Sequence, residues 1–374
     1  MQFMTRLQQT AKVLWILTLF LYGAAQGAAL SPVDDFGNNP GKLRMYEYVP
    51  QGLKEGAPLV IVLHGCGQSA EIYGHGTGWV GMADKVGFVL VLPEQQESNN
   101  PRKCFNWFNG FAWGDYLPWN YRWFGSDIDR DNGEAASIVA MLKTAIQRHR
   151  LDQRRVYITG LSAGGAMTAV MLATYPELFA GGAVLAGVPY KCATDPYAAI
   201  SPSECGLDYP AKKGNARIKS LAPSIWGDKV RDAHKSFRGP WPRLSIWHGT
   251  ADGTVVAASA DELEKQWRNV LGLDQVTASN EPQPDPKHKH AIYRDAQGKV
   301  QLEVHRITGM GHGTPIIDGQ CGRKGEHLFD MGICSSELIA RFWGIGLQVG
   351  QEQSVAPAQI SGRNTSIGAH RPQR

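Results

Sequence analysis

The chain has 374 residues, of which 43% are hydrophobic and 19% are charged, a composition that favours one large globular domain. The formal net charge is only +4, and lysine and arginine are scattered along the chain instead of clustered. These features argue against a nucleic-acid-binding protein, so no nucleic acid is expected as a partner.

The N-terminal segment has the features of a secretory signal peptide. Arg6 and Lys12 precede an apolar run over residues 13–25, which is too short to span a bilayer comfortably, and small residues follow at 27–29. We therefore expect residues 1–28 to be a cleaved signal peptide, with an uncleaved membrane anchor as the alternative. The mature protein would be secreted to the periplasm or the medium, without stable membrane insertion.

Strands and helices alternate along most of the remaining chain. Continuous apolar runs at 59–63 and 88–92, the second closed by Pro93, are typical of parallel strands buried on both faces. Further strands are expected at 43–49, 155–159, 182–186, 243–247 and 300–307, and helices at 79–86, 133–149, 166–174, 261–271 and 335–343. The alternation predicts an α/β fold with a mostly parallel central sheet flanked by helices.

Two long segments interrupt this alternation. Residues 94–131 are rich in aromatic side chains, and residues 190–242 contain two cysteines and several prolines. Loops of this length are usually functional or disordered, and their composition favours ordered loop insertions. Residues 348–374 lack apolar periodicity and are expected to form a disordered tail, so the predicted catalytic domain spans 29–347.

Six cysteines follow the predicted signal peptide: Cys66, Cys104, Cys192, Cys205, Cys321 and Cys334. Sequence alone does not fix their pairing. Local loop closure favours Cys192–Cys205 and Cys321–Cys334, which leaves Cys66–Cys104 as a long-range disulfide. A zinc site is the alternative, but there is no C-x-x-C motif and no histidine at ligand spacing from a cysteine pair, so no metal is expected.

A short β-branched run leads directly into Gly160-Leu161-Ser162-Ala163-Gly164, the G-x-S-x-G pattern of a nucleophile elbow. The small residues allow a sharp turn between a strand and a helix, which lifts the Ser162 hydroxyl out of the sheet. The serine would lie at a helix N-terminus, whose amides favour negative charge that develops on a substrate. Ser162 is therefore the candidate nucleophile.

A serine hydroxyl needs an imidazole to take its proton and a carboxylate to orient that imidazole. After an elbow of this kind the chain order is serine, acid, histidine. Asp252 follows the predicted strand 243–247 and His312 follows 300–307, so both would lie at the same sheet edge as Ser162. Asp252 could instead only form a turn with the glycine after it, with Asp261 as a second candidate acid.

Five other histidines compete with His312: His248, His288, His290, His305 and His327. His248 could support the acid loop, and His305 lies within an alternating strand, where partial burial is expected. His288 and His290 fall in a Pro- and Lys-rich segment that is expected to be a solvated loop. His312 lies between two glycines beyond a strand, which fits a catalytic loop best.

An oxyanion hole needs two amide donors. Ala163, the residue after the nucleophile, supplies one, and the loop after strand 59–63 supplies the second. In that loop the amide of Cys66 is the candidate, with Gly67 as the alternative. A disulfide from Cys66 to Cys104 would hold the donor rigid.

Three further residues are candidates near this site. Trp107 follows Cys104 closely, and Tyr190 follows strand 182–186, so both could border the substrate cleft. Ordinary packing explains either residue equally well. Glu134 heads the predicted helix 133–149 and could act only as a charge at the helix N-terminus.

Several motifs together resemble one known family. They are L-H-G-C-G-Q at 63–68, A-D-K-V-G-F-V-L-V-L-P-E-Q at 83–95, C-F-N-W-F at 104–108, G-L-S-A-G-G-A-M at 160–167, A-G-V-P-Y at 186–190, W-H-G-T-A-D at 247–252 and G-M-G-H-G-T-P at 309–315. In this order they resemble the esterase family of extracellular polyhydroxybutyrate (PHB) depolymerases, within the α/β-hydrolases. The resemblance implies a triad of Ser162, Asp252 and His312, the Cys66 amide in the oxyanion hole, and ester hydrolysis without a cofactor.

The resemblance predicts a secreted serine carboxylesterase that acts on short-chain hydroxyalkanoate esters, as polymer or oligomer. Feruloyl and acetylxylan esterases are also similar, so esters of plant polysaccharides are the alternative substrate class. A peptidase and an inactive binding module on the same fold are the other function classes. An inactive module would be expected to lack the serine or the histidine, whereas all three candidates are present.

Overall fold

The computed structural model describes residues 29–108, 128–194, 198–199, 201, 203–208 and 214–345. The predicted signal peptide and the predicted C-terminal tail lie outside these residues, as do residues 109–127 of the aromatic segment 94–131.

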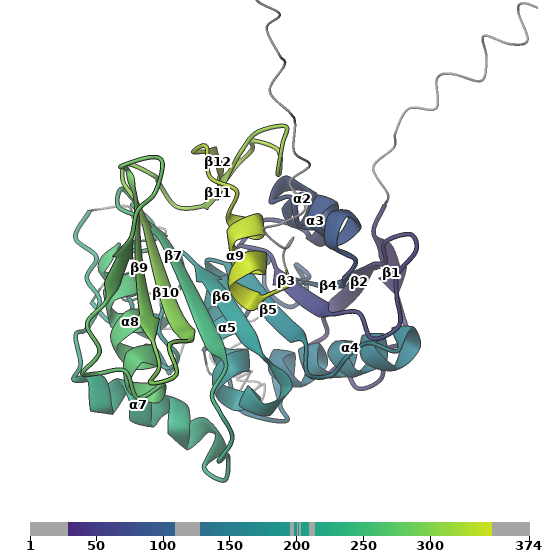
Figure 1. Ribbon diagram of the computed structural model, residues 1–374. Coiled ribbons are helices and arrows are strands. Elements are labelled where there is room, and N and C mark those ends of the chain that lie inside the picture. Colours follow the sequence, from purple (N-terminus) through teal and green to yellow (C-terminus); the bar gives the residue numbers. More distant parts are fainter. Residues whose placement is uncertain are drawn as a thin grey trace, which may run out of the picture.

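A ten-stranded sheet forms the centre of the molecule, in the order β1-β2-β4-β3-β5-β6-β7-β10-β9-β8 (Figure 1). The six strands from β4 to β10 in this order are parallel, and β1, β2, β9 and β8 pair antiparallel at the two sides. The predicted α/β class with a mostly parallel sheet is therefore confirmed. The strands are β1 (Ser31–Val33), β2 (Arg44–Tyr48), β3 (Leu59–Leu63), β4 (Val89–Glu94), β5 (Val156–Leu161), β6 (Gly181–Leu185), β7 (Arg243–Gly249), β8 (Ser279–Glu281), β9 (His288–Arg294) and β10 (Val300–Ile307).

Helices cover both faces of this sheet, because each central strand is apolar on both sides. One core cluster joins alternate strand residues, such as Ile61 and Ile158, to α4 (Gly133–His149), α5 (Ala163–Thr174), α7 (Pro223–Arg231) and α8 (Ala258–Val270). The other cluster joins the opposite residues, such as Val62 and Tyr157, to α2 (Ala70–Gly76), α3 (Trp79–Val86) and α9 (Ser335–Trp343). The α5 helix, buried at every residue, crosses the middle of the sheet.

The boundary predicted at Pro93 is wrong, because β4 continues through Pro93 to Glu94. β3 pairs with β4 only as far as Val91, so the missing N–H of Pro93 leaves no ladder hydrogen bond unmade on that side. The predicted solvated loop around His288 and His290 is also wrong. Both residues lie in β9, which pairs with β10 through His305↔His290.

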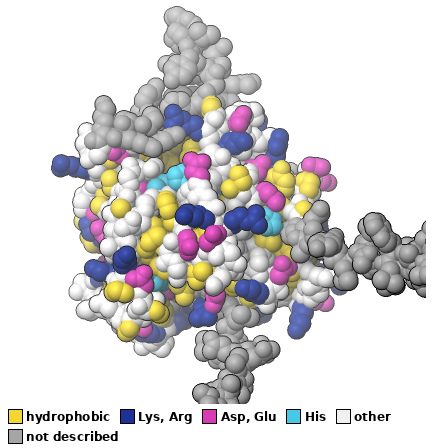
Figure 2. Space-filling view, turned by 90° about the horizontal axis from the view of Figure 1, so that it is seen from above, with side chains coloured by type: hydrophobic (Ala, Val, Ile, Leu, Met, Phe, Trp, Pro, Cys, Tyr) yellow, Lys and Arg dark blue, Asp and Glu magenta, His cyan; other side chains and the backbone are white. Residues whose placement is uncertain are grey.

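Three disulfides fix the loops: Cys66–Cys104, Cys192–Cys205 and Cys321–Cys334. The second and third are the pairs that loop closure favoured, and the first is the pair that it left. The third ties α9 to the segment between β11 (Thr314–Ile316) and β12 (Leu328–Asp330), a small parallel pair after β10. Figure 2 looks down on the end of the molecule where β11 and β12 lie, and shows cationic and acidic side chains interspersed there. Among the described helices, none combines the length and apolar character that a bilayer crossing requires.

Candidate active site

Ser162 occupies a strained turn between β5 and α5. Its backbone angles are φ 57° and ψ −117°, in a region that residues other than glycine rarely adopt. The turn is held from both sides, since the Ser162 amide donates to the Leu185 carbonyl at 2.9 Å and the Ala166 amide donates to the Ser162 carbonyl at 2.8 Å. Gly164 must lack a side chain, because a Cβ there would lie 2.5 Å from the His64 carbonyl oxygen. The partly exposed Ser162 therefore lies just beyond the end of β5 with its backbone fixed.

The loops that carry Ser162, Asp252 and His312 leave the sheet at the same edge. β5, β6, β7 and β10 are parallel neighbours, so their carboxyl ends lie side by side. The loops after β7 and β10 also contact each other, since the Ala251 amide donates to the Met310 carbonyl at 3.0 Å.

Asp252 and His312 are in hydrogen-bonding contact. His312 Nδ1 lies 2.8 Å from Asp252 Oδ2, and both residues are 8% exposed. The other oxygen, Oδ1, accepts hydrogen bonds from the amides of Thr254 at 2.8 Å and Val255 at 2.9 Å. Burial alone would raise the pKa of Asp252, but hydrogen bonds from His248 and His312 outweigh it and hold that pKa well below its usual range. The carboxylate is thus charged when it meets the imidazole.

Two further histidines support this pair. His248 Nε2 lies 3.2 Å from Asp252 Oδ2, so His248 does contact the acid loop, as the sequence suggested. His327 Nδ1 lies 2.8 Å from the carbonyl oxygen of His312, and the two rings pack edge to face. The second candidate acid, Asp261, instead pairs with Arg306 on β10.

In the loop after β3, the amides on both sides of Cys66 are engaged in hydrogen bonds. The Gly65 amide donates to Gln68 Oε1 at 2.9 Å, and the Gly67 amide donates to the Arg102 carbonyl at 2.8 Å. The Gly67 alternative for the oxyanion hole is therefore unfavourable. Within the described residues no hydrogen bond engages the Cys66 amide, and Gly164 packs the start of α5 against this same loop.

The buried carboxylate of Glu134 orders the segment around Cys104, the disulfide partner of Cys66. Glu134 is fully buried and accepts hydrogen bonds from Gln95 Nε2 at 2.5 Å and from the Asn106 amide at 2.9 Å. Gln95 Nε2 also donates to the Cys104 carbonyl at 3.1 Å. Glu134 therefore does more than stabilise the N-terminus of α4, because it orders the segment that anchors Cys66. Sequence reasoning missed this network.

Trp107 and Tyr190 both lie in the core. Trp107 is 7% exposed and packs edge to face against Phe108. Tyr190 is 1% exposed, and its hydroxyl donates to the Ile128 carbonyl at 3.0 Å. Since the ring and hydroxyl of Tyr190 are both buried, its position gives no support to a direct substrate contact, which stays a prediction. Trp107, beside the anchored segment, remains a candidate.

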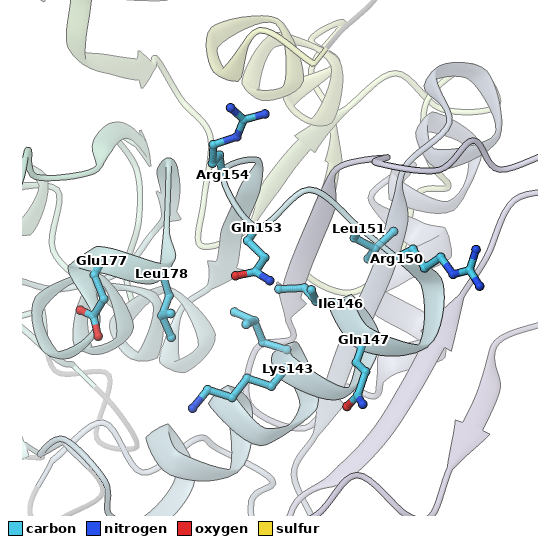
Figure 3. Close-up of a pocket in the computed structure, with 10 residues that line it drawn as sticks. Lys143, Ile146, Gln147, Arg150, Leu151, Gln153, Arg154, Glu177 and Leu178 are labelled. Carbon is cyan, nitrogen blue, oxygen red and sulfur yellow. The ribbon is translucent and has the colours of Figure 1, made fainter.

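A hollow of about 770 Å³ lies away from these loops. Figure 3 shows Lys143, Ile146 and Gln147 on one side of it, and Gln153 and Arg154 on the other. Because Gln153 and Arg154 directly precede β5, the hollow lies at the opposite end of that strand from Ser162. It takes no part in the candidate site.

His64 should make folding stability depend on pH. It is fully buried, with Nδ1 2.7 Å from the Gly65 carbonyl and Nε2 accepting the Gln95 amide at 3.1 Å, so it is neutral in the fold. Burial lowers the pKa of His64 from 6.5 to about 4, and the charge of Lys103 adds to this. His64 binds a proton more readily in the unfolded chain than in the fold. The free energy of unfolding that His64 contributes above pH 6.5 is therefore lost as the pH falls from 6.5 to about 4. The loss is about 3 kcal/mol.

Urea unfolding between pH 7.5 and pH 4 measures this contribution. His64→Gln should be less stable than the wild type at pH 7.5 but lose less stability on acidification, by about 3 kcal/mol over that interval. The exposed Ser224 provides a control, since Ser224→Ala changes no titratable group and should keep the wild-type pH slope. An unchanged slope in His64→Gln would contradict the assigned protonation.

Comparisons with known proteins place this chain among esterases. A sequence model of the family described as esterase PHB depolymerase matches residues 43–283. Poly(3-hydroxyalkanoate) depolymerase C of Paucimonas lemoignei is 41% identical over 321 residues, covering 85% of this chain and 70% of the relative. Feruloyl esterase B of Neurospora crassa is 33% identical over 288 residues, covering 77% of this chain and 89% of the relative.

One solved structure supports the same assignment. An acetyl xylan esterase from Aspergillus awamori superposes with a TM-score of 0.66 at 25% identity, over 85% of this chain and all of that chain. The relatives thus share a reaction class, carboxylic ester hydrolysis, while their names differ in the acyl group.

Proposed function

The chain belongs to the PHB depolymerase family of esterases, with an α/β-hydrolase fold, and from this premise we propose a triad and a substrate. The proposed enzyme is a secreted serine esterase in which Ser162, His312 and Asp252 hydrolyse short-chain hydroxyalkanoate esters. The contact of 2.8 Å between His312 Nδ1 and Asp252 Oδ2, at the edge where Ser162 projects, carries the catalytic part of the proposal.

The reaction follows from this arrangement. Asp252 accepts a hydrogen bond from the Nδ1–H of His312, which keeps the proton on Nδ1 and leaves the Nε2 lone pair of His312 to take the proton of the Ser162 hydroxyl. The serine oxygen attacks the ester carbonyl, and the amides of Ala163 and Cys66 stabilise the oxyanion. His312 then protonates the departing alcohol, and the acyl group stays on Ser162. A water molecule, deprotonated by His312, attacks the acyl-enzyme, so the acid leaves and the serine regains its proton.

The substrate assignment is supported by the relatives. The depolymerase is 41% identical over 321 residues, whereas the feruloyl esterase is 33% identical over 288 residues. Export is supported by the three disulfides, which persist in oxidising compartments. We propose that residues 1–28 are the signal peptide, that 29–347 form the catalytic domain, and that the ester substrate is the only partner the reaction needs.

A substrate panel on the purified mature protein tests the acyl preference. Soluble 3-hydroxybutyrate oligomers, methyl ferulate and acetylated xylan would be assayed side by side for release of acid. We expect kcat/KM for the oligomers to exceed that for methyl ferulate by at least about 10-fold, because acyl pockets discriminate by shape and by polar contacts. Hydrolysis of methyl ferulate or acetylated xylan alone would replace the proposed substrate with the plant polysaccharide class. A peptide amide added to the panel tests for peptidase activity.

A further inference from the structure

A polar cluster lies across three neighbouring strands beside the candidate site. Ser245 on β7 is in register with Glu303 on β10, and Trp247 is in register with His305, which in turn pairs with His290 on β9. Glu303 and His305 are two positions apart on one strand, so they share a face of the sheet. The Trp247 and His305 rings stack at 3.6 Å, and the His305 and His290 rings stack at 3.9 Å.

Glu303 lies within reach of both imidazoles. Its Oε2 is 3.1 Å from His290 Nε2, and its Oε1 is 3.2 Å from His305 Nε2. Glu303 is 5% exposed and His305 is 1% exposed. Among the described residues the buried His305 Nε2 has no hydrogen-bond partner of good geometry, and its contact with Glu303 Oε1 at 3.2 Å is an ion-pair contact. A buried polar nitrogen aimed at a carboxylate and a second imidazole requires an explanation.

We propose that His290, His305 and Glu303 bind a divalent transition-metal ion, of which Zn²⁺ is the best match. The three ligand atoms lie within 4.8 Å of one another. Two ligands held about 2.0–2.1 Å from a tetrahedral Zn²⁺ are about 3.4 Å apart, close to the spacings around Glu303. Two imidazoles and one carboxylate suit Zn²⁺, whereas Ca²⁺ and Mg²⁺ prefer oxygen ligands throughout. Because the His290 and His305 rings stack nearly parallel at 3.9 Å, the partly exposed His290 ring would turn on binding so that both Nε2 atoms point at the ion.

The surroundings of the three ligands favour this assignment. His305 Nδ1 lies 2.8 Å from His288 Nε2, so the ligand imidazole is oriented through its other nitrogen. The Ser245 hydroxyl donates to Glu303 Oε1 at 2.6 Å and itself accepts the Trp247 indole N–H at 2.7 Å. Hydrogen bonds from surrounding residues orient the ligands of protein metal sites in this way. A plain ion-paired cluster of Glu303 with the two imidazoles is the alternative that the metal titration tests.

The ion would act on the fold, not on the ester. It would join β9 to β10, and the loop that carries His312 follows β10 directly. The side chain of His290 is 15% exposed, which gives the ion access from solvent and room for a water molecule as the fourth ligand. The expected effect is a higher melting temperature of the loaded protein, since a ligand that binds only the folded state stabilises it.

Calorimetric titration of chelator-treated mature protein with ZnCl₂, with the disulfides intact, tests the proposal. We expect one Zn²⁺ per chain and a rise in Tm of several degrees at saturation. His290→Gln and Glu303→Gln should each weaken binding by at least about 100-fold, and His288→Gln by about 10–100-fold. Titration with Co²⁺ should give the intense visible absorption of a four-coordinate site in the wild type and not in His290→Gln.

Two variants exclude binding elsewhere. His312→Ala removes the imidazole beside Asp252 and should keep one Zn²⁺ per chain, and His149→Gln removes the separate His149–Glu47 pair and should do the same. Absence of binding to the wild type would overturn the proposal. So would binding that is lost in His312→Ala and kept in His290→Gln. Should circular dichroism show that His290→Gln is unfolded, the wild-type Co²⁺ spectrum still decides, because a six-coordinate spectrum would overturn the proposal.

Discussion

Replacing Ser162 with alanine should lower kcat for ester hydrolysis by about 10⁶-fold, because the acyl-enzyme can no longer form and loss of a triad serine in a comparable hydrolase has an effect of that order. The fold should persist, since the strained turn at Ser162 is fixed by its backbone hydrogen bonds to the Leu185 carbonyl and from the Ala166 amide, which alanine keeps. Initial rates on 3-hydroxybutyrate oligomers, with circular dichroism as the check on folding, measure the effect.

A fluorophosphonate probe distinguishes this result from a simple loss of stability. The wild type should be labelled at a single serine, and Ser162→Ala should be folded but unlabelled. Ser224, an exposed serine on α7, provides the matched control, since Ser224→Ala should keep both labelling and kcat. Labelling that persists in Ser162→Ala would place the nucleophile elsewhere, and a folded wild type that resists the probe would favour an inactive binding module.

The central part of this fold could be predicted from sequence because its signals are local. The apolar run 59–63 and the helices 79–86 and 133–149 coincide with β3, α3 and α4. The G-x-S-x-G pattern depends on neighbouring residues only, and the turn at Ser162 follows from its small flanking residues. Asp252 and His312 could also be proposed from the sequence, since each follows a strand at the edge that parallel strands share.

The remaining features depend on contacts between distant segments. Glu134 meets Gln95 and Asn106 only once α4 packs beside the loop after β4. His290 lies in a strand because β10 offers it a partner, although its own segment is rich in proline and lysine. The cluster around Glu303 could not be predicted either, because its residues meet only when β7, β10 and β9 pair. The expectation that no metal binds was based on cysteine spacing, which excludes only cysteine-based metal sites.

Asp252→Asn should lower kcat by about 10⁴-fold while KM changes by only a few-fold, by analogy with the same change in a serine protease triad. The amides of Thr254 and Val255 donate to Oδ1, so the carbonyl oxygen of an asparagine would take that place. Its NH₂ group would then replace Oδ2 and point at His312 Nδ1. Two donors would face each other, and relief requires the tautomer with the proton on Nε2. That imidazole cannot accept the proton of Ser162.

The second contact of Oδ2 predicts a graded series of effects. His248 Nε2 shares that oxygen at 3.2 Å, so His248→Gln should lower kcat by only about 10-fold, because Asp252 keeps its contact with His312. Asp261→Asn is the matched control, since Asp261 pairs with Arg306 and should be neutral. Pre-steady-state acylation rates and KM would be measured for all three variants. If Asp252→Asn kept more than about a tenth of the wild-type kcat, the carboxylate would not be orienting the imidazole, and the contact at 2.8 Å would serve only to pack the two loops together.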